Sequence, residues 1–441
     1  MQYYSTNRQS GLVSFREATI MGQAPDKGLF FPRQIPKVDK SLIENIENIS
    51  DEEIAFQVIY PYTGSDIAKD KLYEIIRETL SFPIPLVPLD DRIFSLELFH
   101  GPTMAFKDVG ARFMSRCLGH FATTSQTRLS KQTITVLVAT SGDTGGAVAD
   151  GFYGVEGVEV VILYPSGKVS LVQEKQLTTY GDNIHTLEVA GTFDDCQKMV
   201  KQAFADEDLK RKLFLTSANS INVARWLPQQ FYYFLAYKQW KDKANPPVIS
   251  VPSGNFGNIC AGILATRSGL PVKHFIAACN ANDVVSEYLQ TQSLKPKQAV
   301  PTLSNAMDVG DPSNFIRIIE IFQHRFPDLK ECLSSYSITD KETMSCIKRI
   351  FRQYGYCADP HGAVGYCALE RYLEERKDDK GIFLETAHPV KFPTAVEKAT
   401  GRAIELPPHI AALLTKEKQS TRIKPDFNLL KSYLFEGIKT R

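Results

Sequence analysis

The sequence lacks Cys-x-x-Cys pairs, an excess of charge of either sign, and any long apolar run. Without Cys-x-x-Cys pairs it has no pattern typical of a zinc ribbon, an iron–sulfur cluster or a thioredoxin-like site. Its 51 Lys and Arg residues nearly balance its 50 Asp and Glu residues, which leaves a net charge of +1. Such a chain has no overall field that attracts nucleic acid or an anionic membrane, so any anion that it binds must be held locally.

Targeting and metal-binding signals are missing as well. No run of about 18 uncharged apolar residues occurs, and the first 20 residues lack the basic start and apolar core of a signal peptide. We therefore expect a cytoplasmic protein that does not cross a membrane. The eight cysteines have apolar neighbours, which favours reduced, buried thiols over disulfides. No pair of histidines has the spacing of a His-Glu-x-x-His zinc motif, so we expect no metal site.

What is present is a chain of 441 residues, 43% hydrophobic, long enough for two or three domains. Before a Pro-rich stretch at 82–88, one helix is predicted to start at the capping sequence 50–53, and another covers 70–80. From residue 133 onward, β-branched runs alternate with helical patterns, and a second such series follows an aromatic helix expected over 226–240. The strand runs are continuously apolar, which is typical of parallel strands buried on both faces. The sequence thus predicts an α/β protein with two doubly wound lobes and ligands bound where strands end and helices begin.

Two glycine-rich segments lie at expected strand-to-helix junctions. Unsatisfied backbone N–H groups and the helix dipole favour an anion there, and glycine allows a left-handed backbone and close approach. Ordinary βα turns use the same residue types, so one such loop alone does not decide between a turn and a binding site. Neither segment matches the P-loop or dinucleotide fingerprint, which argues against an NTPase or an NAD-dependent enzyme. The two candidate phosphate sites comprise Ser141, Gly142, Asp143 and Thr144, and Gly254, Asn255, Phe256, Gly257 and Asn258.

A lysine lies in an unusual setting in the segment LELFHGPTMAFKDVGAR, residues 96–112. A turn is predicted at His100-Gly101-Pro102-Thr103, and a helix begins near Lys107-Asp108. A Lys-Asp pair is usually a solvated surface pair. Lys107, however, lies between Phe106 and Val109, where desolvation would lower the pKa of its amine and make it nucleophilic. A nucleophilic lysine together with a phosphate-binding loop indicates pyridoxal 5'-phosphate held as a Schiff base.

Seven segments spread over nearly the whole chain resemble those of threonine synthases, which are pyridoxal phosphate-dependent enzymes of fold type II. The resemblance is to the longer, bacterial and fungal form of the family. Together the segments are far more specific than any single glycine-rich loop. They are GLFFP at 28–32, LELFHGPTMAFKD at 96–108, ATSGDTGGAVA at 139–149, SANSINVAR at 217–225, VPSGNFGN at 251–258, TLSNAMDVGDPSN at 302–314 and TAHPVKFP at 386–393.

The resemblance implies roles for individual residues. Lys107 resembles the Schiff-base lysine, which also moves protons, and the loop 254–258 resembles the grip on the cofactor phosphate. Thr386 resembles the hydroxyl residue that faces the pyridine nitrogen, where other pyridoxal enzymes have aspartate. Asp143 resembles the residue beside the cofactor's ring oxygen, a position where many relatives of fold type II carry asparagine. The implied substrate-binding residues are Ser141, Gly142, Thr144, Asn219, Ser220 and Arg225, the last three of them for the substrate's phosphate.

The same resemblance implies a domain organisation and a reaction. Residues 1–92 would be an N-terminal helical segment on the large lobe, 93–224 the smaller lobe with Lys107, and 225–441 the larger lobe with the phosphate-binding loop. The implied reaction converts O-phospho-L-homoserine and water to L-threonine and phosphate. Two alternatives stay open: another fold type II lyase such as a serine or threonine dehydratase, and a threonine synthase-like protein with another activity. Whether the protein is a monomer or a dimer also stays open.

Overall fold

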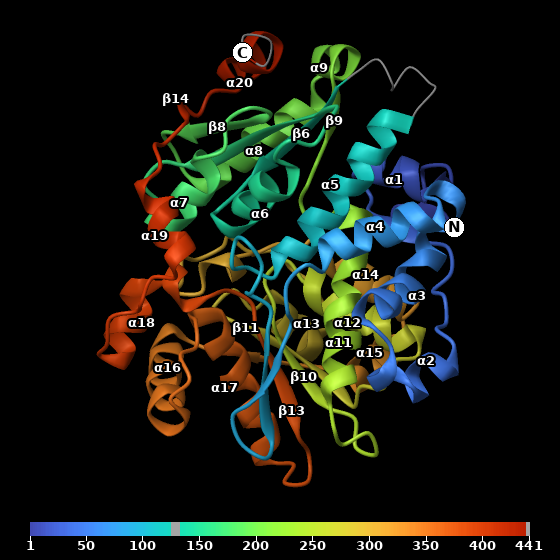
Figure 1. Cartoon of the computed structure of the whole chain (residues 1–441), viewed down its shortest axis with the longest axis vertical. Helices are drawn as coiled ribbons and strands as arrows, with labels where there is room; N and C mark the ends of the chain where they lie inside the picture. The colour runs from blue at the N-terminus through green and yellow to red at the C-terminus, as the bar shows by residue number, and fades with distance from the viewer. Residues whose placement is uncertain (125–132, 438–441) are drawn as a thin grey trace. The chain divides into compact units, whose positions relative to one another are not determined.

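The computed structural model describes residues 1–124 and 133–437, and the chain divides into two compact units (Figure 1). The larger unit comprises Met1, Phe31–Phe106 and Trp226–Glu405. The smaller unit comprises Gln2–Phe30, Lys107–Arg225 and the chain from Leu406 onward. Among the described residues, no helix has the length and apolar character needed to cross a bilayer.

The larger unit is built on a six-stranded sheet with the strand order β12-β11-β10-β13-β5-β4. Neighbouring strands run parallel except at one edge, where β4 pairs antiparallel with β5. The central strands are fully buried, as the continuous apolar runs predicted. The strands are β4 (Leu86–Pro88), β5 (Ile93–Glu97), β10 (Val248–Pro252), β11 (His274–Cys279), β12 (Leu333–Ser337) and β13 (Gly381–Glu385).

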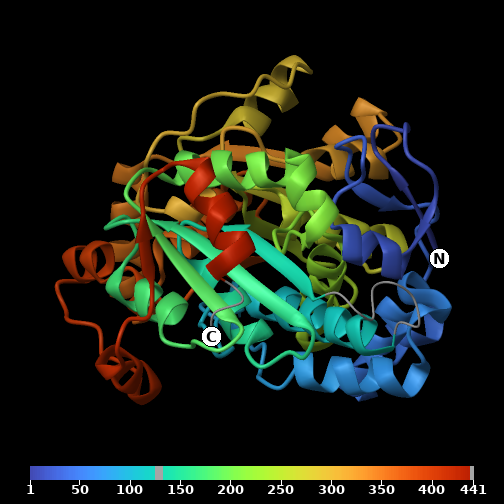
Figure 2. The same cartoon turned by 90° about the horizontal axis from the view of Figure 1, so that it is seen from above.

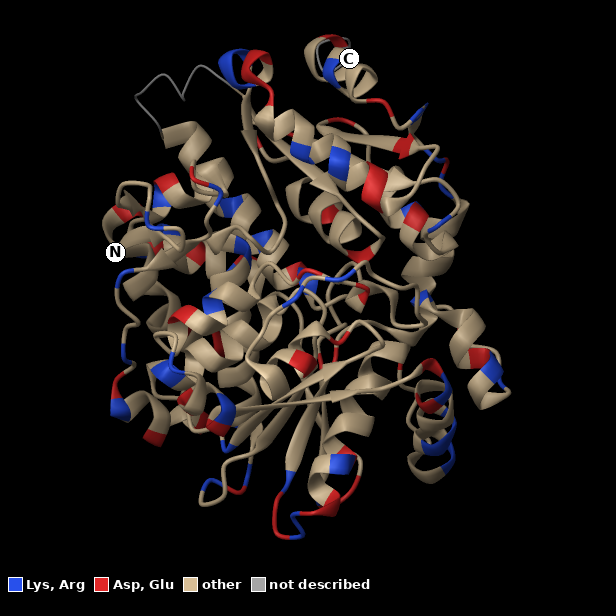
Figure 3. Cartoon of the chain, turned by 180° about the vertical axis from the view of Figure 1, so that it is seen from behind, with Lys and Arg blue, Asp and Glu red and all other residues tan. Residues whose placement is uncertain are grey.

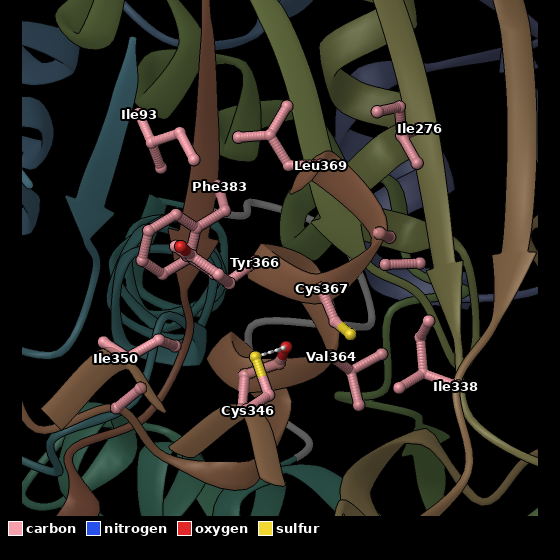
Figure 4. Close-up of a cluster of buried hydrophobic side chains, with 14 of the residues drawn as sticks. Ile93, Ile276, Ile338, Cys346, Ile350, Val364, Tyr366, Cys367, Leu369 and Phe383 are labelled. Carbon is pink, nitrogen blue, oxygen red and sulfur yellow. Dashed lines mark hydrogen bonds between the residues drawn. The ribbon is translucent and has the colours of Figure 1, made fainter. Parts of the chain in front are cut away.

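Alternate residues along these strands face different helix layers, because successive strand side chains point to opposite faces of a sheet. On β11, the ring of Phe275 meets Tyr233 of α11 (Gln230–Gln239) edge to face, with ring centroids 6.0 Å apart. The next residue, Ile276, belongs instead to a core cluster formed with α16 (Asp340–Tyr354) and α17 (Pro360–Glu374) (Figure 4). In that cluster Tyr366 of α17 packs edge to face on Phe383 of β13. Helices therefore cover both faces of the sheet, as a doubly wound lobe requires.

The helices of the larger unit begin where their capping residues predict. The Ser50 hydroxyl accepts a hydrogen bond from the Glu53 amide at the start of α3, and α4 buries Leu72, Ile75 and Ile76 on one face. Both helices that the sequence predicted before the Pro-rich stretch are confirmed. The helices are α2 (Lys40–Glu44), α3 (Asp51–Thr63), α4 (Lys69–Thr79), α11 (Gln230–Gln239), α12 (Gly257–Ser268), α13 (Val284–Thr291), α14 (Phe315–Ile321), α15 (Phe326–Cys332), α16 (Asp340–Tyr354), α17 (Pro360–Glu374) and α18 (Pro393–Thr400).

The aromatic helix expected over 226–240 is not continuous. A short helix, α10 (Val223–Trp226), gives way to a 3₁₀ turn at Leu227–Gln229 before α11 begins. Pro228 lies in that turn, and because proline has no backbone N–H it cannot continue the hydrogen-bond ladder of an α-helix. The four aromatic side chains at 231–234 are buried.

The smaller unit contains a five-stranded parallel sheet in the order β14-β8-β7-β6-β9. Its strands are β6 (Ile134–Ala139), β7 (Val158–Pro165), β8 (Ile184–Val189), β9 (Phe214–Thr216) and β14 (Thr421–Ile423). At the N-terminus, β1 (Gln2–Ser5) pairs antiparallel with β2 (Val13–Ser14), and β3 (Phe30–Pro32) follows. The helices of this unit are α1 (Phe15–Met21), α5 (Lys107–Thr124), α6 (Asp143–Phe152), α7 (Leu171–Thr178), α8 (Phe193–Ala205), α9 (Glu207–Lys212), α19 (Pro408–Thr415) and α20 (Phe427–Ser432).

The C-terminal segment groups with the smaller unit, whereas the sequence analysis assigned it to the larger lobe. Figure 2 shows this segment, drawn in red, crossing to the edge of the smaller sheet, where β14 pairs with β8. Leu430 and Leu434 then complete a buried cluster with residues of α8 and of the sheet. Residues 93–106 group with the larger unit for a related reason, because β5 pairs with β13. Strand pairing between distant segments therefore decides the division of the chain.

Charged residues of both signs are interspersed on the described helices and loops (Figure 3). This distribution agrees with the net charge of +1. The eight cysteines are all unpaired thiols, and six of them are buried.

His274, the first residue of β11, makes the unfolding free energy sensitive to acid. Burial lowers the pKa of its imidazole from 6.5 to about 4. The unfolded chain therefore binds an extra proton below about pH 6.5, so this residue lowers stability as the pH falls from about 6.5 to about 4, by up to about 3 kcal/mol. We expect His274→Asn to reduce this loss. The measurement is urea unfolding of both proteins at pH 7 and pH 4. If the difference in unfolding free energy between the two proteins is the same at both pH values, this expectation is wrong.

Candidate active site

The loop between β10 and α12 has the features of an anion site in the larger unit. Phe256 adopts a left-handed conformation (φ 61°, ψ 13°) as the residue before α12, and its side chain makes no capping hydrogen bond. The first-turn N–H groups of α12 thus have no side-chain cap from this residue. We expected glycine to supply the left-handed backbone of this loop, but the positive φ falls on Phe256.

Gly254 and Asn258 both fit a bound phosphate. A Cβ atom at position 254 would lie 2.6 Å from the Cα atom of Met307, so this close approach, rather than a positive φ, requires glycine. The Oδ1 atom of Asn258 accepts a hydrogen bond from the Tyr233 hydroxyl at 2.8 Å. Its Nδ2 atom is buried and has no hydrogen-bond partner among the described residues. A buried amide donor of this kind, next to a helix N-terminus, matches the needs of a phosphate oxygen.

Asn255 is held by the segment before α14. Its Oδ1 atom accepts from the Ser313 amide at 2.7 Å, and its carbonyl accepts from the Asn314 amide at 3.3 Å. The segment 302–314 singled out in the sequence therefore supports this loop. Ser313 and Asn314 were not predicted as site residues from the sequence, although both lie in that segment.

Thr386 follows β13 and lies beside the chain that leads to Lys107. Its carbonyl accepts from the Phe106 amide at 2.9 Å, and the His388 amide donates to the Met104 carbonyl at 3.1 Å. The buried Lys391 donates through Nζ to the carbonyl of Thr103 at 2.9 Å. The predicted turn at 100–103 is present, since the Met104 amide bonds to the Gly101 carbonyl. These bonds fix the backbone that precedes Lys107.

In the smaller unit, Lys107 is the first residue of α5 and is half-buried, so the predicted helix start is confirmed. Gly110 lies one turn further along the same helix face. A Cβ atom at position 110 would lie 2.6 Å from the Arg225 carbonyl oxygen and 3.2 Å from its Nε. Arg225, only 3% exposed, therefore packs one helical turn from Lys107, and its Nη1 atom donates to the Ala218 carbonyl at 2.8 Å. The fold thus places Arg225 against Gly110, one helical turn from Lys107, although the two segments lie far apart in the sequence.

Two further predicted residues, Asn219 and Ser220, lie in the half-buried turn before α10. The Asn222 amide donates to the Asn219 carbonyl at 3.0 Å, and the Arg225 amide donates to the Asn222 carbonyl at 3.1 Å. The buried Asn222 side chain donates to the Thr19 carbonyl at 2.8 Å and anchors the turn. Asn222 went unnoticed in the sequence, although it lies inside the segment 217–225.

The other glycine-rich loop is held by a residue that the sequence analysis missed. Gly142 has a φ of 139°, and a Cβ atom there would lie 2.5 Å from the side-chain amide of Gln173. Gln173 donates through Nε2 to Oδ1 of the buried Asp143 at 2.9 Å. Ser141 and Thr144 are half-buried beside them. The sequence did contain a signal for the position of Gln173, because Ser170 and Gln173 form a capping box at the start of α7.

The predicted residues divide between the two units. The larger unit holds Thr386 and the loop 254–258, and the smaller unit holds Lys107, Arg225 and the remaining predicted residues. Among the described residues, no group of three or more His, Cys, Asp or Glu side chains is arranged to hold a metal ion.

A parallel α/β architecture with a glycine-rich loop after one buried strand and a lysine at the start of a helix is the arrangement expected of a pyridoxal phosphate-dependent enzyme of fold type II. A family model described as "Pyridoxal-phosphate dependent enzyme" matches residues 80–384. The models "Threonine synthase N terminus" and "Threonine synthase, C-terminal" match residues 2–80 and 362–434. The chain belongs to the threonine synthase family.

Individual relatives agree over the full length. The chain is 42% identical to threonine synthase of Escherichia coli over 98% of this chain and 99% of that one, and 36% identical to that of Saccharomyces cerevisiae over 99% and 98%. The crystal structure of the E. coli threonine synthase matches with a TM-score of 0.90 and 41% identity over 99% of this chain and all of that one. A pyridoxal phosphate-bound threonine synthase from Brucella melitensis matches with a TM-score of 0.91 and 33% identity over all of both chains. A tomato threonine deaminase, with a TM-score of 0.54 and 15% identity over 76% of this chain and 94% of that one, shares the fold alone.

Proposed function

We propose that this enzyme converts O-phospho-L-homoserine and water to L-threonine and phosphate, with pyridoxal phosphate as its cofactor. The observation that carries the proposal is the buried Arg225 one helical turn from Lys107. Together with Asn219 and Ser220, Arg225 provides a second anion site beside the nucleophilic amine. A dehydratase acting on serine or threonine needs the cofactor-phosphate loop but has no leaving phosphate to bind.

Each part of the cofactor has a candidate binding residue in this chain. The loop 254–258 would bind its phosphate through backbone N–H groups and the Asn258 amide, and Lys107 would hold its aldehyde carbon covalently. The Thr386 hydroxyl would face the pyridine nitrogen, and Asp143, oriented by Gln173, would lie beside the ring oxygen. When bound, the cofactor supplies an electron sink for the negative charge that develops on the substrate's carbon atoms.

The remaining steps use the chain's own groups. Once displaced by the substrate amine, the Lys107 amine is free to take the proton from the α carbon and to return protons later. Departure of the γ phosphate follows removal of a β proton. A proton is then added at Cγ to form the methyl group, water adds at Cβ, and the α carbon is protonated again. Arg225, Asn219, Ser220 and Thr144 would bind the phosphate as it leaves, since a guanidinium offers two parallel donors to two phosphate oxygens. Ser141 and Gly142 would bind the substrate carboxylate.

The reaction itself is tested by product analysis. Purified enzyme incubated with O-phospho-L-homoserine should release phosphate and threonine in equal amounts without added metal, and should act poorly on serine and threonine. Faster ammonia release from serine than phosphate release from O-phosphohomoserine would favour a dehydratase. Cofactor binding without either reaction would indicate a threonine synthase-like protein with another activity. By the same interpretation, the protein acts in the cytoplasm on a small-molecule substrate.

Replacing Arg225 with lysine tests the second anion site. Arg225→Lys keeps the positive charge but loses the planar fork that pairs with two oxygens, so kcat should fall by about 10- to 100-fold, with a rise in KM. The visible absorbance of the bound cofactor should stay as in the wild type. Both constants are measured by steady-state assays of phosphate release. Full activity of this variant would show that Arg225 does not bind the leaving phosphate.

A further inference from the structure

His361, near the start of α17, has an imidazole ring whose orientation is fixed by a hydrogen bond at each ring nitrogen. The residue is 2% exposed, and its Nε2 atom accepts from the backbone amide of Ala306 at 3.2 Å. Because Nε2 accepts, the ring proton lies on Nδ1, which donates to Oδ2 of Asp359 at 2.5 Å. The other oxygen of Asp359 caps α17 by accepting from the Gly362 amide at 2.7 Å. The imidazole is thus held in one tautomer and one orientation.

The backbone that His361 holds packs directly behind Gly254. From the Cβ position of residue 254, the Ala306 carbonyl oxygen lies at 3.0 Å and the Met307 Cα atom at 2.6 Å. The far end of this short segment is anchored by Asp308, whose Oδ1 atom accepts from Thr302 Oγ1 at 2.7 Å and Asn280 Nδ2 at 2.9 Å. A shift of Ala306 and Met307 would therefore move the wall against which the loop 254–258 rests.

The same network reaches the end of strand β13. The Asp359 amide donates to Oε1 of Glu385 at 2.6 Å, and Glu385 directly precedes Thr386. Burial, with the nearby Asp359 charge, raises the pKa of the Glu385 carboxyl well above its ordinary value. His361 and Asp359 therefore connect the backbone next to Thr386 with the backbone behind Gly254.

We infer that His361 is a positioning residue for the cofactor-phosphate loop: by accepting the Ala306 amide hydrogen, it fixes the wall behind Gly254 and thereby the donors that bind the phosphate. The inference rests on the proposed assignment of the loop 254–258 to the cofactor phosphate. It requires that loss of the Ala306 bond weakens binding of the phosphate end of pyridoxal phosphate.

Two variants separate the two bonds of His361. In His361→Asn the amide occupies the position of Nδ1, so the contact with Asp359 is kept and the acceptor for Ala306 is lost. In His361→Gln the amide reaches the position of Nε2, so the acceptor is kept. Each apoprotein is titrated with pyridoxal phosphate and with pyridoxal, which lacks the phosphate, and binding is followed by absorbance. Hydrogen–deuterium exchange of residues 304–308 is measured on the same samples.

We expect His361→Asn to weaken binding of pyridoxal phosphate by about three- to tenfold, the effect of one buried hydrogen bond, with binding of pyridoxal nearly unchanged. Exchange over 304–308 should be faster in His361→Asn and close to wild type in His361→Gln, which should also retain most of the affinity. His274→Asn, the same substitution at the opposite end of the sheet, should leave the ratio of the two affinities unchanged.

Three results would overturn the inference: unchanged affinity of His361→Asn for pyridoxal phosphate, an equal loss for both ligands, or a His361→Gln variant no better than His361→Asn. If His361→Asn does not fold, the affinity ratio of His361→Gln still decides, because the inference requires it to stay close to wild type. These binding measurements do not depend on the reaction. A wild-type protein that binds the cofactor but produces no threonine would contradict the proposed function and leave this inference standing.

Discussion

Lys107→Ala should abolish conversion of O-phosphohomoserine, lowering kcat by at least about 10³-fold. The amine of Lys107 is assigned two tasks that no substitute performs: covalent attachment of the cofactor and transfer of the α proton. It is half-buried at the start of α5, with the packed Arg225 one turn away. Alanine is a good helix former, so the variant should keep α5 and the fold.

Borohydride reduction of the wild-type enzyme should fix the cofactor on the peptide that contains Lys107, and peptide mass spectrometry locates it. Lys201→Ala, which removes an exposed lysine from α8 of the same unit, is the matched control and should retain wild-type activity and labelling. Labelling at any other lysine, or a Lys107→Ala variant with substantial turnover, would refute the assignment.

Gly254→Val should weaken retention of pyridoxal phosphate by about 10- to 100-fold, because an overpacked side chain in a close contact costs about 1–3 kcal/mol. The Cβ atom alone would lie 2.6 Å from the Met307 Cα atom, a backbone atom that cannot move aside by a side-chain rotation. Either the loop or the segment behind it must shift. Equilibrium dialysis of the cofactor, with a thermal unfolding curve to confirm folding, measures the effect.

Gly11→Val is the control for Gly254→Val. A Cβ atom at Gly11 would meet no atom within 4 Å among the described residues, so this substitution should leave cofactor retention unchanged. A folded Gly254→Val variant with wild-type cofactor affinity would show that the loop after β10 is only a turn. We expect a larger loss of cofactor affinity in Gly254→Val than in His361→Asn. Gly254 belongs to the loop itself, whereas His361 acts on the loop only through Ala306.

Much of the fold was predictable because its signals are local. Continuous apolar runs predicted the parallel strands, and the Ser50 cap predicted the start of α3. Pro228 shows the limit of the same approach, since the run of aromatic residues suggested one helix where a proline interrupts it. The division of the chain into units was less accessible, because the pairing of β14 with β8 joins segments more than 200 residues apart.

In the candidate site, the sequence by itself determined which residues open helices after strands: Lys107 at the start of α5 and the loop 254–258 before α12. Capping, chain direction and residue chemistry act between near neighbours, so a sequence contains that information directly. The tertiary structure alone decided that Gln173 orients Asp143, that Arg225 packs beside Gly110, and that His361 holds Ala306 behind Gly254. Each of these contacts joins residues at least 30 positions apart, and it exists only because the packing of sheets and helices brings their backbones together.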